Sequence, residues 1–185
     1  MVVAVTLAGC AASDETDDSA TGASSAYSND PAADLDVPRF PKDSLAGRGN
    51  ARMTVAYGDG AFESFDEGEA RVVIALEPER WPHTLIADQG ARGRLLVQLG
   101  RQSEALRAGT YSCADADGRI RLANLETGAS TDASACRIVI DEIDDRQLPD
   151  AVRVHGRFEA ATDPSSPFAS SRVRGAFVAD LVRGS

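Results

Sequence analysis

The sequence predicts an all-β fold, a single antiparallel β-sandwich or barrel-like domain of about 8–10 short strands that follows an N-terminal tether. Three observations predict this fold class. From Ala51 onward, short runs of apolar and β-branched residues alternate with polar residues. Turn-forming Gly and Asp residues separate these runs, and no stretch keeps a helical period. Apolar residues make up 43% of the chain, enough for a real core.

The first expected strands form a hairpin. Ala51–Tyr57 alternates between apolar and polar residues, and Gly58-Asp59-Gly60 follows it as a turn sequence. Ala61–Phe65 is then the expected partner strand. Arg71–Leu76 is nearly continuous in apolar residues, which is typical of a strand covered on both faces.

The middle of the chain predicts four more strands, Leu85–Asp88, Arg94–Leu99, Tyr111–Ala114 and Arg119–Leu125. Asp117-Gly118 lies between the last two of these strands and predicts that they form a hairpin. The segment Gln102–Arg107 predicts one turn of helix. Cys136–Ile143 alternates cleanly and is the next expected strand.

The last two strands carry the clearest pattern, with Val and Phe on one face and charged residues on the other. The segments 154–160 and 173–179 match each other at Val, Gly, Phe and Ala, which indicates two similar strands of one sheet. The loop Thr162–Ser171 joins them. A glycine in a strand beside a phenylalanine suits an aromatic ring that covers the gap, so Gly156 and Gly175 are interpreted in this way. A direct contact of these glycines with a ligand is the alternative.

The N-terminus predicts an export signal. Residues 2–8 are an apolar run too short to span a bilayer, and the run ends in Leu7-Ala8-Gly9-Cys10. These four residues resemble the lipobox of bacterial lipoproteins. The resemblance implies a diacylglyceryl group on the thiol of Cys10, cleavage before Cys10 and acylation of the new amino terminus. Residues 1–9 are then a signal peptide, and because no Lys or Arg precedes the apolar run, we expect its true start to lie upstream.

Residues 10–45 are interpreted as the lipidated cysteine and a disordered acidic tether, and residues 46–185 as the β domain. The tether is rich in Ala, Ser, Asp, Thr, Gly and Pro and shows no apolar periodicity. Pro38–Pro41 is the segment expected to touch the domain first. The predicted location is the cell envelope, at the outer membrane in a Gram-negative cell and otherwise at the outer face of the cytoplasmic membrane. The alternative for residues 2–10 is a buried strand that happens to end in cysteine.

Cysteine number predicts a disulfide. If Cys10 carries lipid, Cys113 and Cys136 remain, and an even remainder in an exported domain favours a bridge between them. The alternative is a metal site or a catalytic thiol, but a spacing of this length without a nearby histidine resembles no metal site. We therefore predict no metal and no cofactor.

Charge argues against a nucleic-acid partner. The formal net charge is −10, whereas phosphate binding needs clustered Lys and Arg. Seven of the 29 acidic residues lie between residues 11 and 38, where no basic residue occurs. The domain itself is therefore only mildly acidic.

Residues that carry catalysis are scarce. The sequence contains no Gly-x-Ser-x-Gly, His-Glu-x-x-His, P-loop or Cys-x-x-Cys motif. Of its two histidines, His83 is expected in a loop and His155 on the outer face of a strand. Asp115-Ala-Asp117-Gly118 resembles the start of a calcium loop, but a turn is favoured because the remaining ligands are misplaced. The acidic run 141–145 is interpreted as a solvated strand end, with calcium as the alternative.

Function is predicted as binding or structural and not enzymatic. Three aromatic residues are expected near the surface as recognition residues, Trp81, Tyr111 and Phe168. An envelope protein or a glycan is the expected class of partner, and the sequence indicates no oligomeric state. The alternative is a cell-envelope hydrolase or modifying enzyme with a carboxylate-based site. A deep polar pocket that holds His83 or His155 beside a carboxylate would favour that alternative.

Overall fold

The structure, a computed structural model, describes residues 34–41, 51–66, 68–73, 83–100, 106–144, 151–163 and 172–182. Sheet A has six strands in the order β2 (Glu63–Phe65), β1 (Ala51–Tyr57), β11 (Arg172–Val182), β10 (Ala151–Ala161), β9 (Ala135–Asp144) and β6 (Gly109–Ser112). Sheet B has five strands in the order β3 (Ala70–Val73), β4 (His83–Asp88), β5 (Arg94–Leu99), β7 (Gly118–Ala123) and β8 (Ser130–Asp132). All neighbouring strands are antiparallel.

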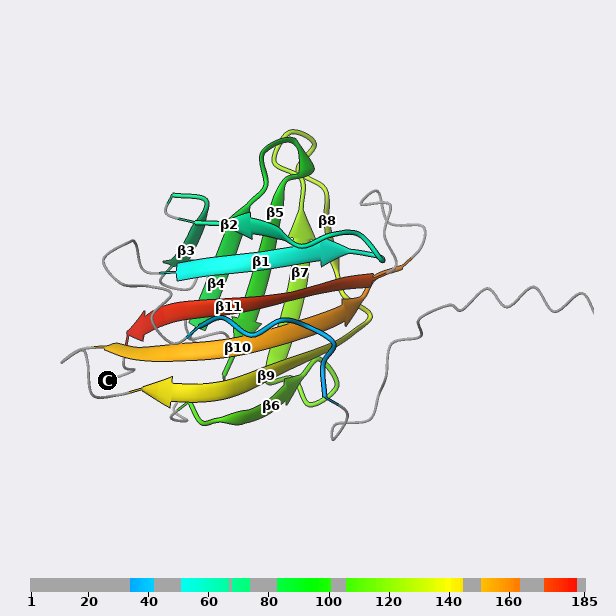
Figure 1. The fold of residues 1–185 in the computed structure, drawn as a ribbon. Coiled ribbons are helices and arrows are strands. Elements are labelled where there is room, and N and C mark those ends of the chain that lie inside the picture. The colour runs from blue at the N-terminus through cyan, green and yellow to red at the C-terminus, as the bar shows by residue number, and fades with distance from the viewer. Residues whose placement is uncertain are drawn as a thin grey trace, which may run out of the picture.

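The two sheets pack face to face, which confirms the predicted β-sandwich. In Figure 1 the long strands of sheet A lie in front, and the strands of sheet B run across them behind. The alternating apolar residues of both sheets meet between the layers and are fully buried, among them Met53, Leu85, Leu95, Ile138, Phe158 and Phe177. Since successive side chains of a strand point to opposite faces, the same alternation leaves a polar outer face on sheet A.

The two strands predicted to be similar, β10 and β11, lie side by side in the middle of sheet A. Each glycine of the repeat is opposite the phenylalanine of the other strand, Gly156 opposite Phe177 and Gly175 opposite Phe158. A Cβ at Gly156 would lie 2.4 Å from the Phe177 ring, and a Cβ at Gly175 would lie 2.5 Å from the Phe158 ring. The rings therefore fill the space above the glycines, as the sequence predicts.

A disulfide joins Cys113 to Cys136, as predicted. Cys113 follows the edge strand β6, and its amide donates to the carbonyl oxygen of Cys136 in β9 at 3.2 Å. The chain between the two cysteines leaves sheet A, forms β7 and β8 of sheet B, and returns. The bridge therefore closes the base of the excursion that ties the two sheets together.

Removal of this bridge should destabilise the domain. The closed loop spans a sequence separation of 23 residues, and its chain entropy corresponds to roughly 3 kcal/mol of unfolding free energy. We expect the double variant Cys113→Ala, Cys136→Ala to lose about that amount in urea unfolding monitored by circular dichroism. Addition of a reductant should have no further effect on the variant. Two freely alkylated thiols in a non-reduced digest of the parent protein would contradict the prediction.

Two local expectations are wrong. Asp117-Gly118 does not form a hairpin, because β6 pairs with β9 in sheet A while β7 pairs with β5 in sheet B. The Asp117 carboxylate instead accepts a hydrogen bond from the Ser112 amide at 2.7 Å, at the point where the chain passes from one sheet to the other. His83 does not lie in a loop, because it begins β4 and is buried.

The remaining local expectations have different outcomes. The hairpin of β1 and β2 across Gly58–Gly60 is confirmed. Most of the predicted helical turn Gln102–Arg107 lies outside the described residues. Among the residues that the structure describes, a 3-10 turn occurs at Gly90–Arg92. Within the part of the chain that the structure describes, no helix has the length and apolar character needed to cross a membrane.

Candidate functional site

A short segment before the first strand crosses the outer face of sheet A. We call residues 34–41 the strap, and Figure 1 shows it in blue in front of β10 and β11. Leu35 and Val37 of the strap are 4% and 7% exposed and form a small apolar cluster with Ala176 of β11. The tether predicted over residues 10–45 therefore does not extend unpacked to residue 45, because residues 34–41 belong to the folded domain. Residues 34–37 alternate between acidic and apolar side chains, so the two apolar side chains can pack against the sheet together.

Arg157 of β10 fixes the first residues of the strap. Its guanidinium donates to both carboxylate oxygens of Asp141 in β9, at 2.9 and 2.7 Å. The same group donates to the Asp34 carboxylate at 2.6 Å and to the carbonyl oxygen of Leu35 at 3.0 Å. Arg157 is only 3% exposed, so its charge-assisted bonds to Asp141 are largely shielded from water, whereas the Asp34 carboxylate is exposed.

These contacts shift two pKa values. The hydrogen bonds that Arg157 donates to Asp141, and more weakly to Asp34, raise the pKa of the Arg157 guanidinium above its ordinary value. The hydrogen bond and positive charge of Arg157 hold the pKa of the Asp34 carboxyl below its usual value. The strap thus keeps its ionic contact at neutral pH, and the contact weakens only as the pH falls through the range in which Asp34 takes up a proton.

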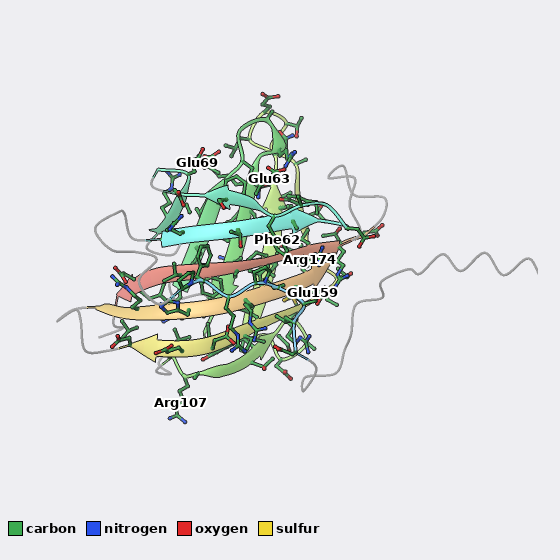
Figure 2. All side chains as sticks on the ribbon, in the orientation of Figure 1. Phe62, Glu63, Glu69, Arg107, Glu159 and Arg174 are labelled. Carbon is green, nitrogen blue, oxygen red and sulfur yellow. A yellow bond between two sulfur atoms is a disulfide. The ribbon has the colours of Figure 1, made fainter. Side chains whose placement is uncertain are left out.

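Aromatic rings hold the rest of the strap. The guanidinium of Arg174 lies 5.1 Å from the centre of the Phe62 ring and also reaches Asp36 of the strap at 3.6 Å. Figure 2 shows Phe62 and Arg174 close together on the outer face of sheet A. At the other end of the strap, the guanidinium of Arg52 lies 5.8 Å from the centre of the Phe40 ring. Cations placed over aromatic faces in this way attract the ring.

A β-bulge lies beside the strap. His155 pairs with Glu142 and Gly156 pairs with Ile140, so Asp141 is the additional residue of β9. The bulge directs the Asp141 carboxylate toward both Arg157 and Arg39, the latter at 3.4 Å. Bulges are over-represented next to binding and active sites because they re-aim side chains.

A pocket of about 190 Å³ opens at this bulge. The strap and the two neighbouring strands line it together, with Arg39, Phe40, Asp141, Glu142, His155 and Gly156. The strap supplies the guanidinium and the aromatic ring, and the sheet supplies two carboxylates and an imidazole. The arrangement can therefore offer hydrogen-bond donors, hydrogen-bond acceptors and an apolar ring surface to one small group.

The residues named from the sequence lie apart from one another. Cys10, Trp81 and Phe168 lie outside the described residues. Tyr111 packs against the core, and its hydroxyl donates to the carbonyl oxygen of Arg107 and accepts from the amide of the same residue, both at 2.9 Å. These contacts give Tyr111 a structural role, and its part in recognition stays a prediction.

Of the two histidines, only His155 lines the pocket, on the outer face of β10 as predicted. The participation of Arg39, Phe40 and Asp141 was not predicted. Two features of the sequence mark them. One is Phe40 within Pro38-Arg39-Phe40-Pro41, in a segment otherwise interpreted as tether, and the other is an acidic run on a strand that pairs with an arginine-rich strand.

His83 is a buried neutral base, and burial lowers its pKa. The unfolded chain then binds more protons than the folded protein below the ordinary histidine pKa of 6.5. We therefore expect the free energy of unfolding to fall as the pH drops below about 6.5. His83→Gln should remove most of this slope between pH 7 and pH 5 in urea titrations, while His155→Gln serves as the matched control. Equal slopes for the parent and His83→Gln would contradict the interpretation.

Among the residues that the structure describes, no group of three or more His, Cys, Asp or Glu is placed to hold a metal ion. Comparison with protein-family models, with curated proteins and with solved structures finds no match to this chain.

Proposed function

We propose that this chain is a lipid-anchored protein of the bacterial cell envelope whose β domain binds a partner and does not catalyse a reaction. The observation that carries the binding role is the pocket at the β9 bulge, because it joins an aromatic ring to several polar groups in one concave place. The anchor rests on the sequence Leu7-Ala8-Gly9-Cys10.

The proposed anchor is supported by the order of features in the N-terminal sequence, an acylation site followed by a spacer. Two or more acyl chains hold a protein firmly to a membrane, whereas one chain binds it only marginally. Between Cys10 and the strap lie residues 11–33, which as a predicted flexible spacer would reach roughly 25–30 Å on average. That distance is enough to present the domain clear of the lipid headgroups.

The anchor predicts membrane attachment that depends on Cys10. In a bacterial host, with the chain behind an intact signal peptide, Cys10→Ala should move the protein from the membrane fraction to the soluble fraction. Cys10 is the proposed acylation site, so the parent should also gain the mass of its acyl groups. The double variant Cys113→Ala, Cys136→Ala, which removes the other two cysteines and keeps Cys10, is the control and should stay with the membranes. A Cys10→Ala variant that still pellets with membranes after a high-salt wash would contradict the anchor.

The binding role is favoured over catalysis by the state of the charged groups. Both carboxylate oxygens of Asp141 accept hydrogen bonds from Arg157, and Arg39 lies 3.4 Å away, so this carboxylate is engaged in ion pairs. The pocket is also small, about 190 Å³, and lies on an outer face of the sandwich.

One observation favours the second candidate, a hydrolase or modifying enzyme. His155 lies directly opposite Glu142 across β9 and β10, and both residues line the pocket. The purified full chain should therefore be assayed on peptidoglycan, polysaccharide, ester and peptide substrates beside the variants Glu142→Gln and His155→Gln. We expect no turnover above background with any of them. Turnover that either variant abolishes while its circular dichroism is unchanged would overturn the binding role.

A further inference from the structure

The size of the pocket limits what it can hold. Sites that enclose drug-sized ligands have volumes of roughly 300–1,000 Å³. The pocket at the β9 bulge, about 190 Å³, is smaller. It therefore suits one ring of a ligand whose remainder stays in solvent.

The lining of the pocket suits a ring with two kinds of surface. Phe40 is half-buried and offers an apolar ring, while Arg52 lies over that ring as a cation. Glu142 and His155 supply hydrogen-bonding groups from the adjoining strands. A pyranose has this complementary character, because it presents C–H groups on its faces and hydroxyl groups around its rim. Apolar contact combined with a few convergent polar groups is the usual composition of a small-molecule site.

The charged groups of the pocket lining limit the class of ligand further. The pocket lining contains one guanidinium and two carboxylates beside an imidazole. The Asp141 carboxylate is paired with Arg39 and Arg157, and Glu142 and His155 also have interaction partners. A phosphate or a polyanion would need clustered cations, and a polycation would need unpaired carboxylates. An uncharged ligand meets neither difficulty.

We propose that this pocket binds a single uncharged pyranose ring, a hexose or an N-acetylhexosamine, at an exposed position of a cell-envelope glycan. The inference rests on the proposed binding role and gives it a ligand class. Phe40 and Arg39 belong to the strap, whereas Glu142 and His155 belong to the sheet. Sugar binding therefore requires a docked strap, and Arg157, which lies outside the lining, is a positioning residue for the site.

The experiment is a titration of the isotope-labelled full chain, with its disulfide intact, followed by amide NMR. The probes are glucose, galactose and N-acetylglucosamine, with inorganic phosphate and spermidine as charged comparisons. We expect at least one sugar to shift the Gly156 and Phe40 amide signals in a saturable way, and neither charged probe to do so. Phe40→Leu keeps an apolar side chain in the strap but removes the ring, and it should weaken sugar binding at least tenfold. Leu125→Ala, an exposed residue remote from the pocket, should leave binding unchanged.

Two further measurements separate the outcomes. An unchanged Val37 amide signal in Phe40→Leu shows that the strap is still docked, so a loss of binding then belongs to the ring. Arg157→Gln should weaken sugar binding together with a shift of the Val37 amide signal. Saturation by phosphate or spermidine alone, or no response to any sugar, overturns the sugar inference but leaves the binding role intact. Turnover of a substrate by the same preparation is the outcome that overturns the binding role.

Discussion

Gly175→Ala should be among the most destabilising single changes in this domain. An alanine Cβ at this position would lie 2.1 Å from the backbone carbonyl oxygen of Thr54 in β1 and 2.5 Å from the Phe158 ring. The ring can turn, but the carbonyl oxygen cannot retreat without opening the β1–β11 ladder, in which Gly175 pairs with Val55. Overpacking usually costs about 1–3 kcal/mol, and because backbone is involved here we expect about 4 kcal/mol.

The measurement is urea unfolding by circular dichroism, with the slope checked for a two-state transition. Gly128→Ala is the matched control, because the space around it is open and only its φ of +70° opposes a side chain. That control should lose about 1 kcal/mol. A Gly175→Ala protein as stable as the control would show that β1 does not approach β11 as closely as described.

Arg157→Ala should have the second large effect. The substitution leaves the Asp141 carboxylate with the exposed guanidinium of Arg39 as its described ion-pair partner. It also removes the donor to Asp34 and to the Leu35 carbonyl oxygen. Removal of one partner of a buried ion pair costs about 3–5 kcal/mol, because the remaining charge is left poorly compensated. We expect a loss in that range, together with undocking of the strap.

Unfolding by urea gives the free energy, and hydrogen exchange at the Val37 amide reports the strap. That amide donates to the Leu35 carbonyl oxygen at 2.8 Å. Arg39→Ala is the control, because its side chain is 63% exposed and such surface pairs contribute about 1 kcal/mol or less. Slow exchange of the Val37 amide in Arg157→Ala would show that Leu35 and Val37 hold the strap without the ion pair.

The sandwich could be predicted because its determinants are local. Period-two alternation places Phe158 and Phe177 on one face, and the glycine opposite each ring follows from the repeat of one seven-residue pattern. The disulfide followed from cysteine number and compartment. The sequence predicts less well which strand belongs to which sheet. A turn sequence such as Asp117-Gly118 can join two paired strands of one sheet or two strands of different sheets.

The pocket could not be predicted, because its parts come from distant regions of the chain. Arg157 and Asp34 are 123 residues apart, and nothing near either residue indicates the other. The bulge that displaces Asp141 depends on how β9 pairs with β10, which a single strand sequence does not encode. The composition of residues 34–37 resembles that of the preceding tether, so the strap is distinguished by its apolar side chains Leu35 and Val37 and by Phe40.

The strap also has a mechanical consequence. If Cys10 is held in a membrane, a pulling force on the chain acts on Asp34 before it acts on any described strand, and the ion pair of Asp34 with Arg157 resists it first. Release of eight residues would lengthen the connection by roughly 26–29 Å, at 3.3–3.6 Å per extended residue. The two sheets and their disulfide do not contain the strap, so they can remain folded while this length is released. A pulling force could therefore lengthen the connection between the membrane and the folded domain by undocking the strap.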